Sequence, residues 1–419
     1  MNSFLLWTLC FAIVIIVIVS FNFNLTPSLF GSILIVFSII KMKLLPRFRS
    51  ACLNNPKPNS MGETDSDVDV DVDAKPLHIP PHLVIMVNGI IGSSADWRYG
   101  AEQFLKKLPD EVIVHRSECN SSKLTFDGVD TMGERLAEEV LSVVRRWPGL
   151  QKISFVAHSL GGLVARYAIA RLFDYSSTIE VEFTSRNCNC KEEAKCTKNC
   201  IEQHYEARIA GLEPMNFITF ATPHLGSRGH KQLPFLCGIP FLERKASQTA
   251  HLVTGRTGKH LFLMDNDDGK PPLLLRMVDD SDDLKFMSAL CAFKRRVAYA
   301  NANFDHMVGW RTSSIRRQHE LPKFNHQVID EKYPHIVHTK SETVDDISSE
   351  ESTNVGGETI DMEEEMIRGL TRVPWERVDV SFRKSKQRFV AHSTIQVKIY
   401  WMHSDGSDVI FHMIDNFLV

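Results

Sequence analysis

The chain lacks an excess of charge of either sign and lacks a regular set of cysteines. Its 419 residues hold 48 Lys and Arg against 51 Asp and Glu, so no basic bias points to nucleic acid as a partner. The nine cysteines are odd in number and scattered, which does not fit a disulfide framework and is typical of a reducing compartment. No internal repeat is present. With 43% hydrophobic residues, the chain can bury one large core.

Charge is absent altogether from the first 40 residues. Phe4 to Phe21 is nearly unbroken apolar sequence, long enough to span a bilayer, and a shorter apolar run extends from Leu29 to Ile40. A signal peptide fits poorly, because there is no positive n-region and no small-residue cleavage site. A basic cluster follows: Lys41, Lys43, Arg47 and Arg49. By the positive-inside tendency, we expect residues 1–49 to anchor the protein in a membrane with the rest of the chain on the cytoplasmic side.

Translation from Met61 is the alternative, and it would leave a cytosolic protein without this segment. Met61-Gly62 with Ser66 matches the minimal myristoylation pattern. We expect residues 50–80 to be a disordered acidic linker. Its alternating aspartates lack the loop glycine and closing glutamate of a calcium hand; they are Asp65, Asp67, Asp69, Asp71 and Asp73.

The strongest motif centres on Ser159. The apolar run Lys152 to His158 predicts a strand, and the pattern from Leu163 to Phe173 predicts an amphipathic helix. A serine between a strand and a helix, flanked by small residues, is typical of a nucleophile elbow, where the hydroxyl is held exposed at a sharp turn. The usual pattern has glycine two residues before the serine, and Ala157 replaces it here. His158 is interpreted only as the spacer residue of the elbow.

A second glycine-bearing loop lies upstream. The apolar run Leu83 to Val87 ends at Asn88-Gly89, which by itself is typical of a strand-ending turn. Together with the elbow, it predicts an oxyanion hole made of backbone N–H groups. The expected donors are Ile90 and Leu160, with Ile91 as a further candidate.

An acid and a base are expected downstream in the order serine, acid, histidine. Asp305 follows the strand-like stretch Arg296 to Ala302, and His392 follows the last predicted strand, Val378 to Phe382. A carboxylate past a strand end can hold an imidazole in the correct tautomer. Other candidates for the acid are less suitable because they form an acidic cluster typical of a solvated loop: Asp279, Asp280, Asp282 and Asp283. For the base, His224 precedes Asp305 and breaks the expected order. Three more histidines are interpreted as surface or packing residues: His306, His403 and His412.

On these motifs, from about Pro81 to Val419, the chain resembles the serine esterase or lipase-like family of the α/β-hydrolase superfamily, particularly its plant members. Further matching segments are Phe220 to Ser227 and Thr312 to Ser314. The resemblance implies carboxyl-ester hydrolysis, of lipid esters above all, with no metal or organic cofactor. Asn88 stands where many relatives carry histidine, which leaves the backbone donors of the loop intact.

Short apolar strands alternating with helical patterns, such as Thr131 to Trp147, predict an α/β fold: a mostly parallel central sheet, helices on both faces and an inserted cap or lid. The hydrolase domain is expected over residues 81–419, with insertions near 185–205 and 318–372. The apolar stretch within Pro234 to Leu263 is either a lid suited to a lipid interface or a packed helix pair. Ser341 to Glu365 is expected to be a disordered loop.

Three functions remain open from the sequence: a membrane-associated lipase or esterase, an acyltransferase with the same triad, and a hydrolase-fold scaffold that binds lipid or protein without turnover. One metal question is also open, because four cysteines could hold structural zinc but lack paired C-x-x-C spacing: Cys188, Cys190, Cys196 and Cys200. The sequence gives no indication of oligomeric state.

Overall fold

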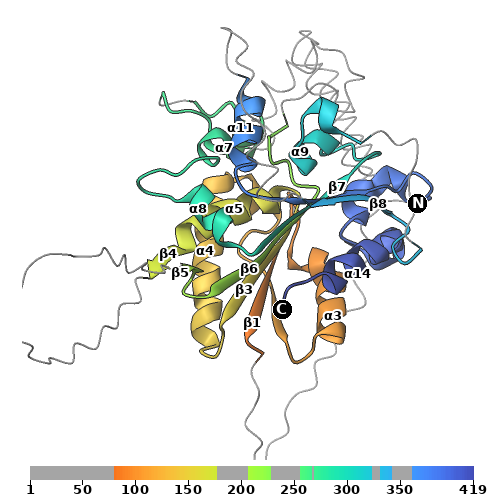
Figure 1. Ribbon diagram of the computed structural model, residues 1–419, viewed down its shortest axis with the longest axis horizontal. Coiled ribbons are helices and arrows are strands. Elements are labelled where there is room, and N and C mark those ends of the chain that lie inside the picture. Colours follow the sequence, from red (N-terminus) through yellow and green to blue (C-terminus); the bar gives the residue numbers. More distant parts are fainter. Residues whose placement is uncertain (1–79, 177–205, 228–254, 267–268, 323–330, 342–360) are drawn as a thin grey trace, which may run out of the picture. The chain divides into compact units, whose positions relative to one another are not determined.

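The computed structural model describes residues 80–176, 206–227, 255–266, 269–322, 331–341 and 361–419. A seven-stranded sheet in the order β2-β1-β3-β6-β7-β9-β8 forms its centre (Figure 1). All neighbouring pairs are parallel except β8 and β9. The strands are β1 (His82–Val87), β2 (Val112–Arg116), β3 (Lys152–His158), β6 (Glu213–Phe220), β7 (Arg295–Asn301), β8 (Ile336–Ser341) and β9 (Glu376–Val380).

The central strands are mostly apolar because both faces of the sheet are covered. In β1, Leu83 and Ile85 belong to the core on one face, whereas Val84 and Met86 belong to the core on the other. Successive side chains of a strand point to opposite faces, so a strand buried on both sides is nearly continuously apolar instead of alternating. The expected α/β fold with a mostly parallel sheet is thereby confirmed.

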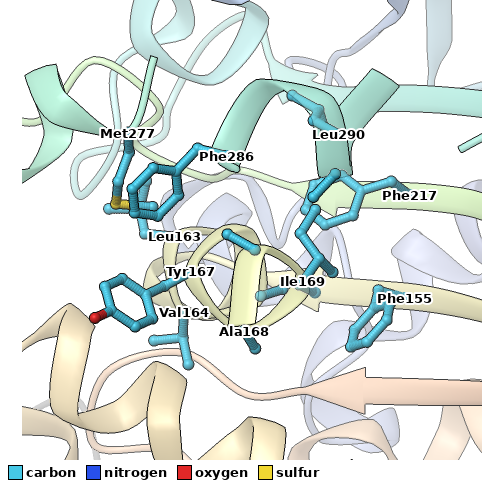
Figure 2. Close-up of a cluster of buried hydrophobic side chains, with 14 of the residues drawn as sticks. Phe155, Leu163, Val164, Tyr167, Ala168, Ile169, Phe217, Met277, Phe286 and Leu290 are labelled. Atoms are coloured by element: carbon cyan, nitrogen blue, oxygen red, sulfur yellow. The ribbon is translucent and has the colours of Figure 1, made fainter. Parts of the chain in front are cut away.

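The first face carries α4 (Val129–Arg146), α5 (Leu160–Leu172) and α8 (Phe286–Ala292). Helix α4 is amphipathic, and its buried residues, such as Leu136 and Val140, recur at helical spacing. Helix α5 is buried nearly all round, because it lies between the sheet and the other two helices. Figure 2 shows Leu163 and Ile169 of α5 in the cluster that also includes Phe286 of α8. This packing fixes the helix that begins directly after Ser159.

The opposite face carries α3 (Arg98–Lys107) and α14 (Ser407–Asp415), which contact each other. Shorter helices occupy the chain between and after the later strands: α7 (Leu273–Arg276), α9 (Trp310–Ser314), α11 (Met362–Leu370), α12 (Ala391–Thr394) and α13 (Tyr400–His403). Because the carboxyl ends of parallel strands share one edge, the segments after β1, β3, β7 and β9 meet there.

A small antiparallel ribbon, β4 (Phe173–Ser176) with β5 (Glu206–Ile209), flanks the expected insertion at 185–205. That insertion lies outside the described residues. The predicted anchor (1–49), all but the last residue of the predicted linker (50–80) and the apolar part of the predicted lid lie outside them as well. Residues 255–261, at the end of the lid segment, are helical. Within the described ranges, no helix combines the length and apolar character needed to cross a membrane.

The expected insertion near 318–372 has structure of its own where it is described. Strand β8 adds an antiparallel edge to the sheet, and α11 begins at Met362, inside the segment that was expected to be a disordered loop. The side chain of Asp361 accepts a hydrogen bond from the Glu363 N–H, which caps the helix. Acidic residues in the first turn stabilise the start of a helix. The acid-rich composition at the end of this segment therefore does not by itself indicate disorder.

Candidate active site

Ser159 lies in a sharp turn between β3 and α5. Its backbone has φ 54° and ψ −129°, a region that costs a non-glycine residue about 1–3 kcal/mol. Two hydrogen bonds hold it there: the Ser159 N–H donates to the Phe220 carbonyl (2.8 Å), and the Thr222 hydroxyl donates to the Ser159 carbonyl (2.9 Å). The strained turn predicted from the sequence is therefore present and supported from β6.

Small residues allow the turn to pack against the loop after β1. A Cβ atom at Gly161 would lie 2.5 Å from the Asn88 carbonyl oxygen, and one at Gly89 would lie 2.9 Å from the Ser159 Cβ. Real Cβ atoms essentially never approach this closely, so both positions require glycine. Ala157 is fully buried, and its methyl group is accommodated in the core on the α5 side.

His392 bridges the serine and the acid. Its Nδ1 lies 3.0 Å from Asp305 Oδ2 and its Nε2 lies 2.9 Å from Ser159 Oγ. An ionised carboxylate can only accept, so Nδ1 carries the proton and Nε2 accepts from the serine hydroxyl. The structure thus brings together all three residues singled out in the sequence. His392 belongs to the short helix α12 rather than to the loop that was expected.

Asp305 is held as a carboxylate by several donors. Burial, with 2% of the side chain exposed, by itself raises its pKa. Attraction to the His392 ring when it is protonated, with hydrogen bonds from His392, Asn301 and the Val308 N–H, outweighs burial, so the net pKa of Asp305 lies below its ordinary value. The acid therefore stays ionised at neutral pH and can orient the imidazole.

The three candidate oxyanion donors, the backbone N–H groups of Ile90, Ile91 and Leu160, differ in their surroundings. The Ile91 N–H donates to the Thr125 hydroxyl oxygen (2.9 Å), so it is already engaged. The N–H groups of Ile90 and Leu160 have no hydrogen-bond acceptor among the described residues. Leu160 is the first residue of α5, where backbone N–H groups are unpaired and the helix dipole favours negative charge. Of the three candidates, Ile90 and Leu160 are therefore the two whose N–H groups are not engaged within the described residues.

His158 does more than separate the strand from the serine. Its Nε2 lies 2.7 Å from the main-chain carbonyl of His392, and the two rings are 4.7 Å apart. A carbonyl cannot donate, so His158 Nε2–H is the donor. Burial, followed by the charge of His392, holds the pKa of His158 well below its ordinary value, which keeps the ring neutral. The interpretation of His158 as a spacer alone was wrong.

The remaining candidates fill structural roles. His224 is fully buried, with Nε2 3.1 Å from Thr219 Oγ1 and its ring against Trp375, and burial holds its pKa well below the ordinary value. Asp280 accepts hydrogen bonds from two backbone N–H groups at the start of α8. Elsewhere, His306 is exposed, His403 contacts the Ile399 backbone and His412 contacts Tyr299.

Over the described part of the chain, no group of three or more His, Cys, Asp and Glu is placed to hold a metal ion. The four clustered cysteines, Cys188 to Cys200, lie outside that part.

Comparison with known proteins identifies the family. Residues 78–315 match the family described as "Putative serine esterase (DUF676)". Similar curated proteins include "Putative lipase YDL109C" of Saccharomyces cerevisiae, 28% identical over 242 residues, and "Putative lipase C4A8.10" of Schizosaccharomyces pombe, 28% identical over 243 residues. Each match covers 56% of this chain but only 30% and 26% of the relative. The chain therefore spans less than one third of the length of these relatives.

Similar solved structures include a lipase and a phospholipase. The lipase BlEst2 of Bacillus licheniformis in its mature form is 16% identical, with a TM-score of 0.29, and covers 54% of this chain and 67% of that chain. The phospholipase PlaB of Legionella pneumophila in complex with thio-NAD is 13% identical, with a TM-score of 0.29, over 54% of this chain and 38% of that one. The sheet described above is that of an α/β-hydrolase fold. Because the family match spans more than half of its length, the chain belongs to the serine esterase family so described.

Proposed function

We propose that the protein hydrolyses carboxyl esters through a catalytic triad of Ser159, His392 and Asp305. The observation that carries the proposal is the continuous chain of hydrogen bonds from the Asp305 carboxylate through the His392 ring to the Ser159 hydroxyl. In this tautomer, the serine proton already points at a free imidazole lone pair, which is the arrangement that a serine nucleophile needs.

The chemistry follows from these positions. Ser159 Oγ attacks the ester carbonyl while His392 Nε2 takes the serine proton, and the carbonyl oxygen becomes an oxyanion facing the N–H groups of Ile90 and Leu160. The carbon–oxygen bond to the alcohol then breaks, His392 gives its proton to the departing alkoxide, and the acyl group stays on Ser159. Water next attacks this acyl-serine while His392 takes a proton from it; the bond to Ser159 Oγ breaks, His392 returns the proton to the serine, and the acid is released. Loss of one oxyanion donor costs about 10²–10³ in turnover in comparable sites.

Lipid esters are the proposed substrates. Exposed apolar side chains lie on the segments that carry or support the site: Ile91 beside the oxyanion donors, Leu124 beside Thr125, Met307 beside the acid and Phe389 before the base. Exposed apolar groups gathered around a polar site favour a substrate with acyl chains. The curated relatives bear the name lipase, which agrees with this choice.

The protein as a whole is proposed to be membrane-associated. In this proposal residues 1–49 are the anchor, 50–80 the linker and 81–419 the hydrolase domain, facing the cytoplasm and interrupted near 185–205 and 318–372. The apolar run of the first segment and the basic cluster after it support this arrangement. A cytosolic form beginning at Met61 would instead partition with the soluble fraction.

The test is hydrolysis of a panel of lipid esters by the full chain, with Ser159→Ala as the inactive variant. Ser142→Ala, on the exposed face of α4, is the matched control. We expect free fatty acid from wild type and the control, and none above background from Ser159→Ala. New esters formed when an alcohol is supplied would instead identify an acyltransferase. No turnover of either kind by the folded wild-type protein would contradict the proposal and favour a non-catalytic scaffold.

A further inference from the structure

The segment that carries His392 is unusually basic. Residues 383–401 contain five cationic side chains, and no acid occurs between Asp379 and Asp405, in a chain whose formal net charge is −3. Lys398 pairs with Asp96 (2.9 Å), whereas Arg383, Lys384 and Lys386 are exposed. We call residues 383–401 the basic–aromatic strip.

Large apolar side chains protrude from the same strip. Trp401 is 76% exposed and Tyr400 is 58% exposed, and Ile399 and Phe389 are exposed as well. Single exposed apolar residues are ordinary, but three in succession that end in a largely exposed tryptophan mark an interaction surface.

The strip carries His392 of the Ser159 site and also packs against the neighbour of Asp305. At one end, the Phe389 ring meets Phe304, the neighbour of Asp305, edge-on with centroids 5.8 Å apart, and the Arg388 guanidinium lies over the Phe389 ring at 4.7 Å. At the other end, Tyr400 stacks on Tyr99 of α3 with centroids 5.1 Å apart. A partner bound to the strip would therefore contact the segment that holds His392 and the side chains next to Asp305.

We propose that the basic–aromatic strip, which carries His392, docks the protein on an anionic lipid membrane. Tryptophan and tyrosine favour the boundary between headgroups and acyl chains, and lysine and arginine next to them are attracted to anionic headgroups. The inference rests on the proposed function, since a lipid hydrolase must take its substrate from such a surface. The exposed apolar side chains of the strip favour a bilayer over an acidic protein segment, such as residues 63–73 of the same chain.

The test measures contact of Trp401 with lipid in the full-length Ser159→Ala protein. Vesicles are made of phosphatidylcholine, alone or mixed with phosphatidylserine, and carry a fluorescence quencher on the acyl chains. Subtracting the signal of the Trp401→Phe variant isolates the quenching of Trp401 from that of the other tryptophans. Every variant retains residues 1–79, so membrane binding through that segment is common to all of them.

We expect Trp401 to be quenched by the mixed vesicles and not by phosphatidylcholine alone. Each basic residue near an anionic surface contributes roughly fivefold to partitioning, so Lys384→Glu with Lys386→Glu should lower the ratio of docked to undocked strip by roughly 25-fold or more, seen as lost quenching of Trp401 at saturating mixed vesicles. The matched control, Arg145→Glu with Arg146→Glu, makes the same charge change at the exposed end of α4 and should leave it unchanged. Thermal unfolding midpoints verify that all variants are folded.

Three results would overturn the docking proposal: no quenching of Trp401, equal quenching on both kinds of vesicle, or equal losses in the two charge variants. Protection of Trp401 from an aqueous quencher in the absence of lipid would also overturn it, and would assign the strip to the acidic segment or to a second copy of the chain. The protein used has no Ser159 nucleophile, so the result is independent of whether ester hydrolysis is confirmed.

Discussion

Replacement of Gly161 by alanine tests whether catalysis depends on the close approach of the elbow to the oxyanion loop. The added Cβ would lie 2.5 Å from the Asn88 carbonyl oxygen and 2.8 Å from that of Val87. Both neighbours are backbone atoms, so neither can swing aside. A separation of 3.0 Å is the closest that real Cβ contacts reach, and the two loops must therefore part by at least about 0.5 Å, at an overpacking cost of roughly 1–3 kcal/mol.

That movement separates the two proposed oxyanion donors, because Leu160 precedes Gly161 and Ile90 follows the Asn88-Gly89 turn. A misplacement of about 1 Å can cost roughly 10²-fold in rate, so we expect Gly161→Ala to lower kcat by roughly 10- to 100-fold with little change in KM. The assay is steady-state hydrolysis of a water-soluble short-chain ester, with urea unfolding to measure stability.

Ala157→Gly is the control, since it restores the usual glycine without adding an atom. It should leave turnover unchanged while costing about 0.5–1 kcal/mol of stability as a glycine within a strand. Wild-type kcat in a folded Gly161→Ala protein would refute the reasoning, as would an equal loss of kcat in both variants.

Three further predictions concern the site and the core. Asp305→Asn should lower kcat by roughly 10³–10⁴, because the imidazole is no longer held in the productive tautomer; activity within tenfold of wild type would contradict this. His158→Phe keeps a ring but removes the donor to the His392 carbonyl, and should lower kcat by about tenfold at unchanged KM; a change in KM alone would count against a positioning role. Burial, followed by the charge of Lys152, lowers the pKa of His82 to about 4. The folded state therefore binds fewer protons than the unfolded state between about pH 6.5 and 4, so stability falls by about 3 kcal/mol as the pH drops through that window; urea titrations of His82→Gln should show a weaker fall, and an unchanged one would refute the assignment.

The parts of the fold that depend on local pattern could be predicted from the sequence. The strand expected directly before Ser159 is present as β3, and the strand predicted from Arg296 lies within one residue of β7 at both ends. Buried parallel strands leave an unmistakable apolar run, so their limits are visible in the sequence. The antiparallel edge strand β8 was not foreseen, because a partly exposed edge strand such as Ile336–Ser341 lacks that run.

The site could be predicted where chain order and strand ends constrain it, which was enough to single out Ser159, Asp305 and His392. Contacts made across the fold could not be predicted. His158 donates to a carbonyl 234 residues away, and Thr125 occupies the Ile91 N–H from a different segment. Spacing within a motif carries no information about such partners, which depend on how distant loops pack together.

The most direct test of the triad is to map the site of a fluorophosphonate adduct on the full-length protein by mass spectrometry. We predict a single modified residue, Ser159, and loss of labelling in both Ser159→Ala and His392→Ala. A folded wild-type protein that does not react, or an adduct that forms at the same rate without His392, would contradict the central claim that Ser159 is an activated nucleophile.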